Sequence, residues 1–312
     1  MLDSPDTRQT RLGARIASRV SGSVQLMTAI EVTALTKRYG KLVAVNEVSF
    51  SIEHGETFVL LGPNGAGKST IIEILEGFRS KTSGEAKVLG IQVESGTRHL
   101  RSRLGIVVQS AGDLGRLSVA EIIKHFASMY PNPRDVDSVI AAVGLEGKAG
   151  ELVRKLSGGQ QHRVDVALGL IGNPEVLFLD EPTTGFDPEV RRQFWDVIRG
   201  LQSEGMTIML TTHYLDEAEV LGHRGGVIVD GELVALGKIS ELGGIEARQP
   251  EVSYLRDGEL VSRLTDRPAE LVQNIAAELG GEPERLQIRI PDLESVYLEL
   301  LQKHRKSDRV EN

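Results

Sequence analysis

Residues 62–70 read Gly62-Pro63-Asn64-Gly65-Ala66-Gly67-Lys68-Ser69-Thr70, which fits the phosphate-binding pattern G-x-x-x-x-G-K-[ST]. The apolar residues 57–61 before it are typical of a buried strand, and residues 71–75 after it can continue as a helix. Glycines let backbone N–H groups surround a phosphate chain, and the start of a helix adds its positive dipole end. In this pattern Lys68 reaches the β- and γ-phosphates, and the Ser69 hydroxyl binds Mg²⁺. The stretch therefore predicts a binding site for a nucleoside triphosphate.

The composition narrows the class of protein. The chain has 312 residues, a net charge of -8 and no cysteine. This length allows one large or two modest domains, and the lack of cysteine excludes disulfides and thiolate metal sites. The negative charge argues against a nucleic-acid surface, so no nucleic-acid partner is expected. No apolar run approaches the roughly 18 residues needed to cross a bilayer, and we expect a cytosolic protein.

The first 26 residues differ from the rest of the chain. Arginines spaced three or four apart alternate with apolar residues, which is compatible with a short basic amphipathic helix: Arg8, Arg11, Arg15 and Arg19, with Leu12, Ile16 and Val20 between them. The alternatives are a disordered extension or an upstream start codon, with Met27 as the true initiator. Because a strand pattern begins only at Ile30, we expect residues 1–26 to be a disordered extension.

Strand and helix patterns alternate after residue 30. Val48, Phe50 and Ile52 lie on one face of a β-like region over residues 30–52. Ser118 and Glu121 form a capping box that predicts a helix to about residue 129. The other expected elements are strands at 86–89, 104–108, 176–179 and 208–211, helices at about 136–143 and from 188, and a hairpin at 227–236. This alternation predicts a parallel sheet with helices on its faces.

The residues from 244 onward form a separate block. The turn Asp257-Gly258 joins two short strand patterns, which predicts a hairpin over residues 251–264. Pro268 begins a helix to residue 279, a strand covers 286–290, and Pro291 begins a final helix. We therefore expect a small α+β accessory domain at 244–312, after a main domain at 27–243.

Two further motifs bear on the chemistry. An apolar strand at 176–179 ends in Asp180 and Glu181, where Asp180 can lie near Mg²⁺ and Glu181 can polarise a water in line with the γ-phosphate. The segment Ser157-Gly158-Gly159-Gln160 follows Leu156 and begins a helix, so its hydroxyl and amides can form a second anion-binding site. Since the chain has its own phosphate loop, the second site is expected to serve the nucleotide of a partner.

Together the three motifs resemble those of the ATP-binding cassette (ABC) transporter family, whose signature reads Leu-Ser-Gly-Gly-Gln. The resemblance spans residues 30–236 and implies further roles: Tyr39 stacks on adenine, Gln109 meets Mg²⁺ and water, Asp187 lies in the loop that crosses the dimer interface, and His213 contacts the γ-phosphate. It implies Glu181, His213, Lys68 and Gln109 as catalytic residues and Ser69, Gln109 and Asp180 as Mg²⁺ ligands. Phe186 stands in place of the usual leucine, and Gln161-His162 in place of more basic residues. An active ATPase is expected.

The resemblance also implies an architecture and partners. The fold is that of a P-loop NTPase with a RecA-like α/β core and parallel sheet, an antiparallel β subdomain and a helical subdomain at about 97–171. Two chains bind two MgATP head to tail and drive a separate transmembrane permease at the cytoplasmic face of a bacterial membrane. The single cassette with an acidic tail looks like ATPase subunits of bacterial drug-resistance, lipid- or polysaccharide-exporting systems.

Two alternative functions stay open from the sequence. An importer ATPase would have a similar cassette and a regulatory tail domain. A soluble ABC ATPase of DNA repair or translation usually carries tandem cassettes, coiled coils or zinc modules, and none of these patterns is visible here. The transported substrate is unreadable, because this subunit need never touch it.

Overall fold

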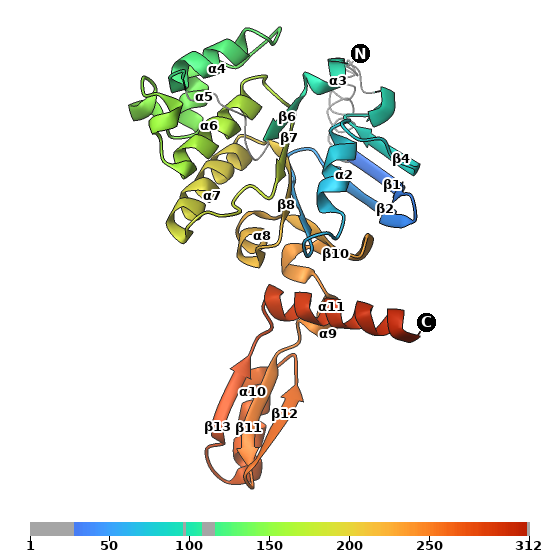
Figure 1. The fold of residues 1–312 in the computed structure, drawn as a ribbon. Coiled ribbons are helices and arrows are strands. Elements are labelled where there is room, and N and C mark those ends of the chain that lie inside the picture. The colour runs from blue at the N-terminus through green and yellow to red at the C-terminus, as the bar shows by residue number, and fades with distance from the viewer. Residues whose placement is uncertain (1–27, 96–97, 108–115, 311–312) are drawn as a thin grey trace, which may run out of the picture.

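The computed structural model describes residues 28–95, 98–107 and 116–310 and contains three sheets. The main body holds two of the sheets, and the third lies in a projecting C-terminal unit (Figure 1). The predicted N-terminal extension at 1–26 and Gln109 lie outside the described residues. Within the described ranges, no helix is both long and apolar enough to span a bilayer.

A six-stranded sheet in the order β10-β9-β3-β8-β7-β6 forms the centre of the main body. Its strands are β3 (Thr57–Leu61), β6 (Leu104–Val107), β7 (Val176–Asp180), β8 (Thr207–Thr212), β9 (Arg224–Val229) and β10 (Glu232–Lys238). All neighbours pair in parallel except β9 and β10, which form the predicted hairpin. The carboxyl ends of parallel strands meet at one edge, where open α/β sheets bind their ligands. The loops after β3, β7 and β8 therefore lie together.

Both faces of this sheet are buried, which explains its continuous apolar strands. Phe58 and Leu60 of β3 belong to one core, and Val59 and Leu61 to the other. The first core also contains residues of α2 (Lys68–Leu75). The second core contains residues of the following helices: α4 (Val119–Ala127), α5 (Val136–Ala142), α6 (Gly158–Leu170), α7 (Pro188–Ser203) and α8 (Leu215–Leu221). Helices α2 and α6 thus lie on opposite faces of the sheet.

An antiparallel sheet in the order β2-β1-β4-β5 packs beside α2. Its strands are β1 (Thr28–Tyr39), β2 (Leu42–Glu53), β4 (Ser83–Val88) and β5 (Ile91–Gln92). Val48, Phe50 and Ile52 are all buried, as the alternation predicted. Short 3-10 helices at Val93–Ser95, Glu146–Lys148, Val153–Lys155 and Ile239–Glu241, and helix α3 (Arg98–Arg101), complete the main body.

Polar side chains cap the starts of four helices of the main body, α4, α5, α6 and α7. Ser118 and Glu121 form the predicted capping box of α4, although the helix ends at Ala127 and not at residue 129. Ser157 and Gln160 form a second capping box at α6. The Asp187 carboxylate accepts from two backbone N–H groups at the start of α7. Each cap satisfies N–H groups that a helix start leaves without a backbone partner.

The C-terminal segment contains the predicted hairpin, helix and strand. Strands β11 (Glu251–Arg256), β12 (Glu259–Leu264) and β13 (Glu284–Arg289) form an antiparallel sheet in the order β12-β11-β13. Helix α10 (Pro268–Leu279) covers one face, with a small core of Val252, Tyr254 and Ile275. The short helix α9 (Gly244–Ala247) precedes the sheet.

The last helix, α11 (Leu293–Val310), returns to the main body. Leu293 is fully buried within the main core, and its backbone N–H donates to a Glu219 carboxylate oxygen of α8 at 3.1 Å. This contact could not be predicted from the sequence, because nothing in the periodicity of α11 indicates which element it covers. The division of the chain at residue 243 stays a prediction.

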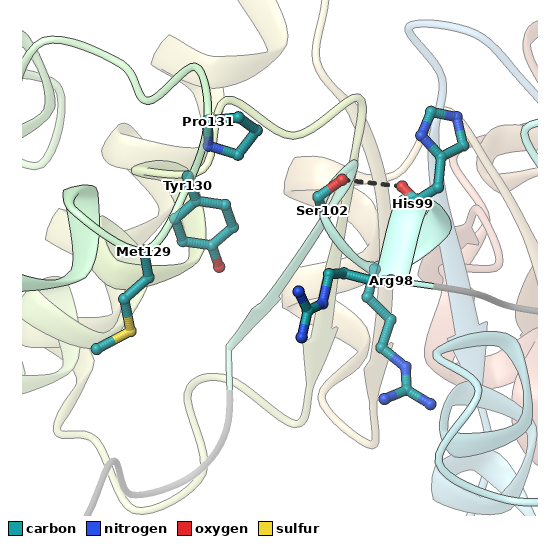
Figure 2. Close-up of a pocket in the computed structure, with 7 residues that line it drawn as sticks. Arg98, His99, Ser102, Met129, Tyr130 and Pro131 are labelled. Carbon is teal, nitrogen blue, oxygen red and sulfur yellow. Dashed lines mark hydrogen bonds between the residues drawn. The ribbon is translucent and has the colours of Figure 1, made fainter.

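A cavity of about 670 Å³ opens between α3 and the end of α4 (Figure 2). Arg98, His99 and Arg101 line one side, and Met129 and Tyr130 line the other. The three basic side chains and Met129 are exposed. The cavity thus combines a basic wall with an apolar one.

Candidate functional site

Glycine is required at two positions of the phosphate loop by close backbone contacts. A Cβ on Gly62 would lie 2.3 Å from the Ile228 carbonyl oxygen, and one on Gly67 would lie 2.4 Å from the Ala44 carbonyl oxygen. Gly67 also adopts a φ of 104° as the residue before α2, a conformation that favours glycine. The β9–β10 turn supports the loop, since the Gly231 N–H donates to the Ala66 carbonyl at 3.1 Å.

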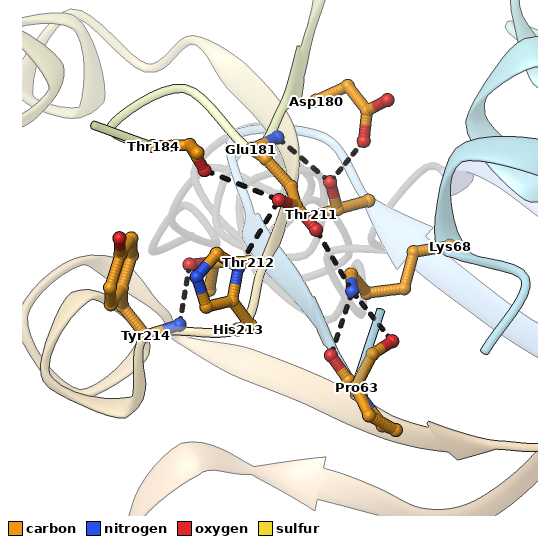
Figure 3. A network of polar contacts seen from close by, with 10 residues as sticks. Pro63, Lys68, Asp180, Glu181, Thr184, Thr211, Thr212, His213 and Tyr214 are labelled. Carbon is orange, nitrogen blue, oxygen red and sulfur yellow. Dashed lines mark hydrogen bonds and ion pairs between the residues drawn. The ribbon is translucent and has the colours of Figure 1, made fainter. Parts of the chain in front are cut away.

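The Lys68 ammonium lies inside the loop, and its side chain is only 3% exposed. It donates to the carbonyl oxygens of Gly62 at 2.8 Å and Pro63 at 3.1 Å. It also forms an ion pair with a Glu181 carboxylate oxygen at 3.1 Å (Figure 3). A buried cation needs such partners, because its desolvation is costly.

Glu181 follows the end of β7 and is surrounded by polar groups (Figure 3). Its backbone N–H donates to the Thr211 hydroxyl oxygen at 3.0 Å. The backbone of Glu181 itself has a φ of 47°. Its carboxylate contacts Lys68, accepts from the Thr184 hydroxyl at 3.3 Å, and lies 3.2 Å from His213 Nδ1. Residues that follow three different strands, β3, β7 and β8, therefore fix this carboxylate at the edge of the sheet.

The charge around Glu181 keeps it ionised. Burial by itself raises the pKa of Glu181, but the hydrogen bond and charge of Lys68, with the charge of His213, outweigh that effect. The pKa therefore lies below its ordinary value of 4.5. At neutral pH the group is a carboxylate, the form that can accept a proton from water.

Asp180 is held by a residue that the sequence analysis missed. The Thr211 hydroxyl donates to Asp180 Oδ1 at 2.5 Å while it accepts from the Glu181 N–H. A threonine inside a strand gives no sequence signal for this role.

The nearby Glu76 carboxyl has a raised pKa. Burial, followed by the charges of Asp180 and Glu73, raises the pKa of Glu76 to about 8. Glu76 therefore adds little negative charge beside Asp180 at neutral pH.

A cavity of about 650 Å³ joins these groups. Its lining includes both predicted and unpredicted residues: Tyr39, Leu42, Ala44, Asn64, Gly65, Gly67, Lys68, Ser69, Thr70, Glu73, Asp180 and Glu181. Tyr39 is 39% exposed. Lys37 Nζ lies 5.0 Å and the guanidinium carbon of Arg79 lies 5.4 Å from its ring centroid. The cavity therefore combines an aromatic ring, a phosphate loop and two carboxylates from the end of β7.

The Ser157–Gln160 segment lies away from this cavity and does not contribute to its lining within the described residues. Ser157 is exposed, and its hydroxyl oxygen accepts from the Gln160 N–H at 3.3 Å, which leaves the hydroxyl proton free to donate outward. A Cβ on Gly159 would lie 2.2 Å from Val190 Cγ1 of α7. The segment thus packs against the helix that Asp187 caps.

Two residues that depart from the usual pattern contact each other. His162 of α6 and Phe186 of the Asp187 loop have ring centroids 5.2 Å apart in an edge-to-face arrangement. Phe194 of α7 completes the cluster, at 5.5 Å from His162 and 6.2 Å from Phe186. This aromatic cluster attaches the loop before α7 to the signature helix.

The structure sorts the predicted site residues into two groups. It brings together the phosphate loop, Tyr39, Asp180, Glu181 and His213. It leaves Ser157–Gln160 and Asp187 on a separate exposed surface at the starts of α6 and α7.

Comparison with known proteins identifies the family. Residues 45–184 match the family model described as "ABC transporter". The chain is 35% identical over 325 aligned positions to Nod factor export ATP-binding protein I of Rhizobium meliloti (strain 1021), with 95% of each protein covered. It is 37% identical over 247 positions to the probable multidrug ABC transporter ATP-binding protein YbhF of Escherichia coli (strain K12), covering 78% of this chain and 42% of that protein.

Solved structures of ATP-binding cassettes share the fold of the main body. The cbiO1 protein from Clostridium perfringens aligns with a TM-score of 0.64 and 29% identity, covering 69% of this chain and 90% of that one. A dimeric post-hydrolysis structure of the cassette MJ0796 with ADP and Pi aligns with a TM-score of 0.59 and 25% identity, covering 67% and 98%. The fold is therefore the P-loop NTPase fold of these cassettes, as predicted. The chain belongs to the ATP-binding subunits of ABC transporters, and it is an ATPase.

Proposed function

We propose that this subunit hydrolyses ATP to drive export through a separate membrane protein. The observation that carries the chemistry is the ionised Glu181 carboxylate between Lys68 and His213, at the edge of a cavity with a phosphate loop. Glu181 accepts a proton from the attacking water, while Lys68 and His213 stabilise the charge on the transferred phosphoryl group. Relatives named for Nod factor export and multidrug transport favour export over import or a non-transport function.

The residues present fit a magnesium ion bound together with the nucleotide. Mg²⁺ prefers oxygen ligands and commonly uses one or two protein groups beside phosphates and water. The Ser69 hydroxyl and the Asp180 carboxylate both line the cavity, and Thr211 orients Asp180. When bound, the ion would neutralise phosphate charge. By resemblance to the family, Gln109 would be a third ligand.

We further propose that two copies of the chain complete each other's sites. Ser157 and Gly158 are exposed at the start of α6, apart from the chain's own phosphate loop. A head-to-tail pair would place them against the nucleotide of the partner, with Asp187 at the interface. The related cassette MJ0796 has a solved dimeric structure bound to ADP and Pi, which supports the pairing of two chains.

Replacing Ser157 with arginine tests the dimer. Monomeric Ser157→Arg is expected to bind ATP nearly as well as the unmodified chain, because the variant's own phosphate loop still holds the phosphates. ATP-driven dimerisation should weaken at least about tenfold, because a bulky cation replaces a small donor and the helix cap is lost. Gel filtration with MgATP and a labelled-ATP titration measure the two effects.

Ser203→Arg, an exposed serine at the end of α7, is the matched control. Ser157→Asp keeps a capping side chain but opposes phosphate, so it should also prevent dimerisation. Mixing Ser157→Arg with Lys68→Ala chains should restore some turnover, because each mixed pair retains one intact composite site. Loss of ATP binding by monomeric Ser157→Arg would place the segment in the chain's own site.

The basic cavity between α3 and α4 is the proposed contact for the membrane subunit at the cytoplasmic face of the membrane. Arg98 and Arg101 are exposed on its basic wall, and the exposed Met129 lies on the opposite wall from Arg98 (Figure 2). An acidic and apolar segment of the partner would complement both walls.

Charge reversal tests this contact. Arg98→Glu with Arg101→Glu should release the subunit from washed membranes of cells that express the complete transporter, since like charges then oppose each other. ATP binding by the isolated chain should not change. Arg256→Glu, at the far end of β11, is the control. Full retention of the double variant on the membrane would exclude this cavity as the docking site.

A further inference from the structure

A stack of side chains connects His213 to the start of helix α7. The ring centroids of His213 and Tyr214 are 4.1 Å apart, with their planes tilted by 39°. The guanidinium carbon of Arg191 in α7 lies 4.7 Å from the centroid of the same tyrosine ring. Tyr214 therefore lies between a residue of the ATP site and a residue of α7.

Arg191 is itself held in place from several sides. Its guanidinium forms an ion pair with Asp216 at 3.2 Å and lies 5.8 Å from the Trp195 ring centroid. The Trp195 indole N–H donates to the fully buried Glu217 of α8 at 3.2 Å. These contacts join the first turns of α7 to α8, so the guanidinium has little freedom to leave the tyrosine ring.

The same turn of α7 carries the cap of the helix. The Arg191 backbone N–H donates to the Asp187 carbonyl oxygen at 3.0 Å, one helical turn earlier. The Asp187 side chain accepts from the N–H groups of Glu189 and Val190. A displacement of the Asp187 loop would therefore move Arg191 with it.

At the other end of the stack, His213 is directed at the site. Its Nδ1 lies 3.2 Å from Glu181, whose second carboxylate oxygen contacts Lys68 (Figure 3). The Tyr214 N–H donates to the Thr212 hydroxyl at 3.0 Å, which fixes the backbone that carries the ring. The imidazole ring is thus held against the tyrosine ring, and its Nδ1 lies next to the carboxylate without a hydrogen bond to it.

We propose that Tyr214 is a positioning residue for His213, and that Arg191 couples its position to the loop of Asp187. This inference rests on the proposed function, in which His213 acts on the γ-phosphate and Asp187 lies at the dimer interface. It adds that the partner cassette, by contacting that loop, sets the orientation of His213 through an arginine and a tyrosine. Neither residue touches the nucleotide in this role.

Substitution of Tyr214 separates positioning from simple stability. Tyr214→Leu is expected to lower kcat about tenfold with an unchanged dissociation constant for ATP, since small misplacements of a reacting group are costly. Tyr214→Phe keeps the ring and should stay within about twofold of the unmodified kcat. Single-turnover kinetics, an ATP titration and a thermal melt measure the three quantities. A kcat for Tyr214→Leu within about twofold of the unmodified enzyme would overturn the proposal.

A double-mutant cycle shows whether Tyr214 acts through His213. His213→Ala with Tyr214→Leu should be no slower than His213→Ala alone, because there is no imidazole left to position. If the loss of kcat in the double variant equals the product of the losses in the two single variants, the proposal is overturned. If His213→Ala itself keeps full turnover, the proposed function of His213 fails. If it abolishes turnover while Tyr214→Leu does not lower it, only the present inference fails.

Arg192, the next residue of the chain, provides a control for the role of Arg191. Arg191→Gln should lower kcat several-fold in the ATP-bound dimer, because the tyrosine ring loses the cation over it. Arg192→Gln should have no effect, since Arg192 is exposed. Equal effects of the two substitutions would overturn the coupling through Arg191.

Discussion

Replacement of Glu181 by glutamine is expected to lower ATP turnover by about 10²–10⁴-fold while ATP binding persists. An amide cannot accept a proton from water, but its oxygen can still accept from Lys68, 3.1 Å from the present carboxylate. The phosphate loop and its backbone contacts stay intact. A phosphate-release assay beside a labelled-ATP titration separates the two effects.

The same variant should accumulate as a dimer in MgATP, because closure no longer ends in hydrolysis. Gel filtration with and without nucleotide would show this. Glu204→Gln, an exposed glutamate paired with Arg134, controls for loss of one negative charge. Near-normal turnover of Glu181→Gln would remove Glu181 from its role as the general base.

Replacement of Lys68 by alanine is expected to affect the binding of the nucleotide, the step before hydrolysis. Hydrogen bonds to charged groups contribute about 1.5–3 kcal/mol, so affinity for ATP should fall roughly 10–100-fold. Turnover should be lost as well, because the same ammonium stabilises charge on the transferred phosphoryl group. Titration with labelled ATP measures the affinity.

Two checks accompany the Lys68 variant. Lys124→Ala, an exposed lysine of α4, should bind ATP normally. A thermal melt shows whether Gly62 and Pro63, whose carbonyls accept from Lys68, keep the loop folded without it. A folded variant with unchanged affinity and turnover would contradict the assignment of the phosphate loop.

Local patterns predicted most of the fold because their physical causes are local. The apolar run of β3 reports burial on both faces, and Phe58 and Val59 do belong to different cores. The capping box at Ser118 marks the start of α4 because it satisfies N–H groups of that helix itself. The phosphate loop was recognisable because close backbone contacts require glycine at two of its positions.

Other features depend on residues far apart in the chain and left no local signal. Thr211 orients Asp180, 31 positions away, by a hydroxyl that any strand threonine carries. Arg191 and Tyr214 meet only because α7 and α8 pack together. In the sequence, Phe186 and His162 are separate departures from the usual pattern. Their direct contact emerges only when the loop before α7 is folded onto α6.

The return of α11 to the main body changes what kind of segment the C-terminal sheet is. The chain leaves the main core at Ile239 and Leu242 and re-enters it at Leu293, so residues 243–292 are fixed at both ends. Arg248 strengthens the exit by donating to the carbonyl oxygens of Ile239 and Leu242. The small sheet is therefore an insertion and not a tail. A truncation after residue 243 would also strip α11 and uncover apolar surface, whereas exchanging the sheet for a short linker would leave both anchors in place.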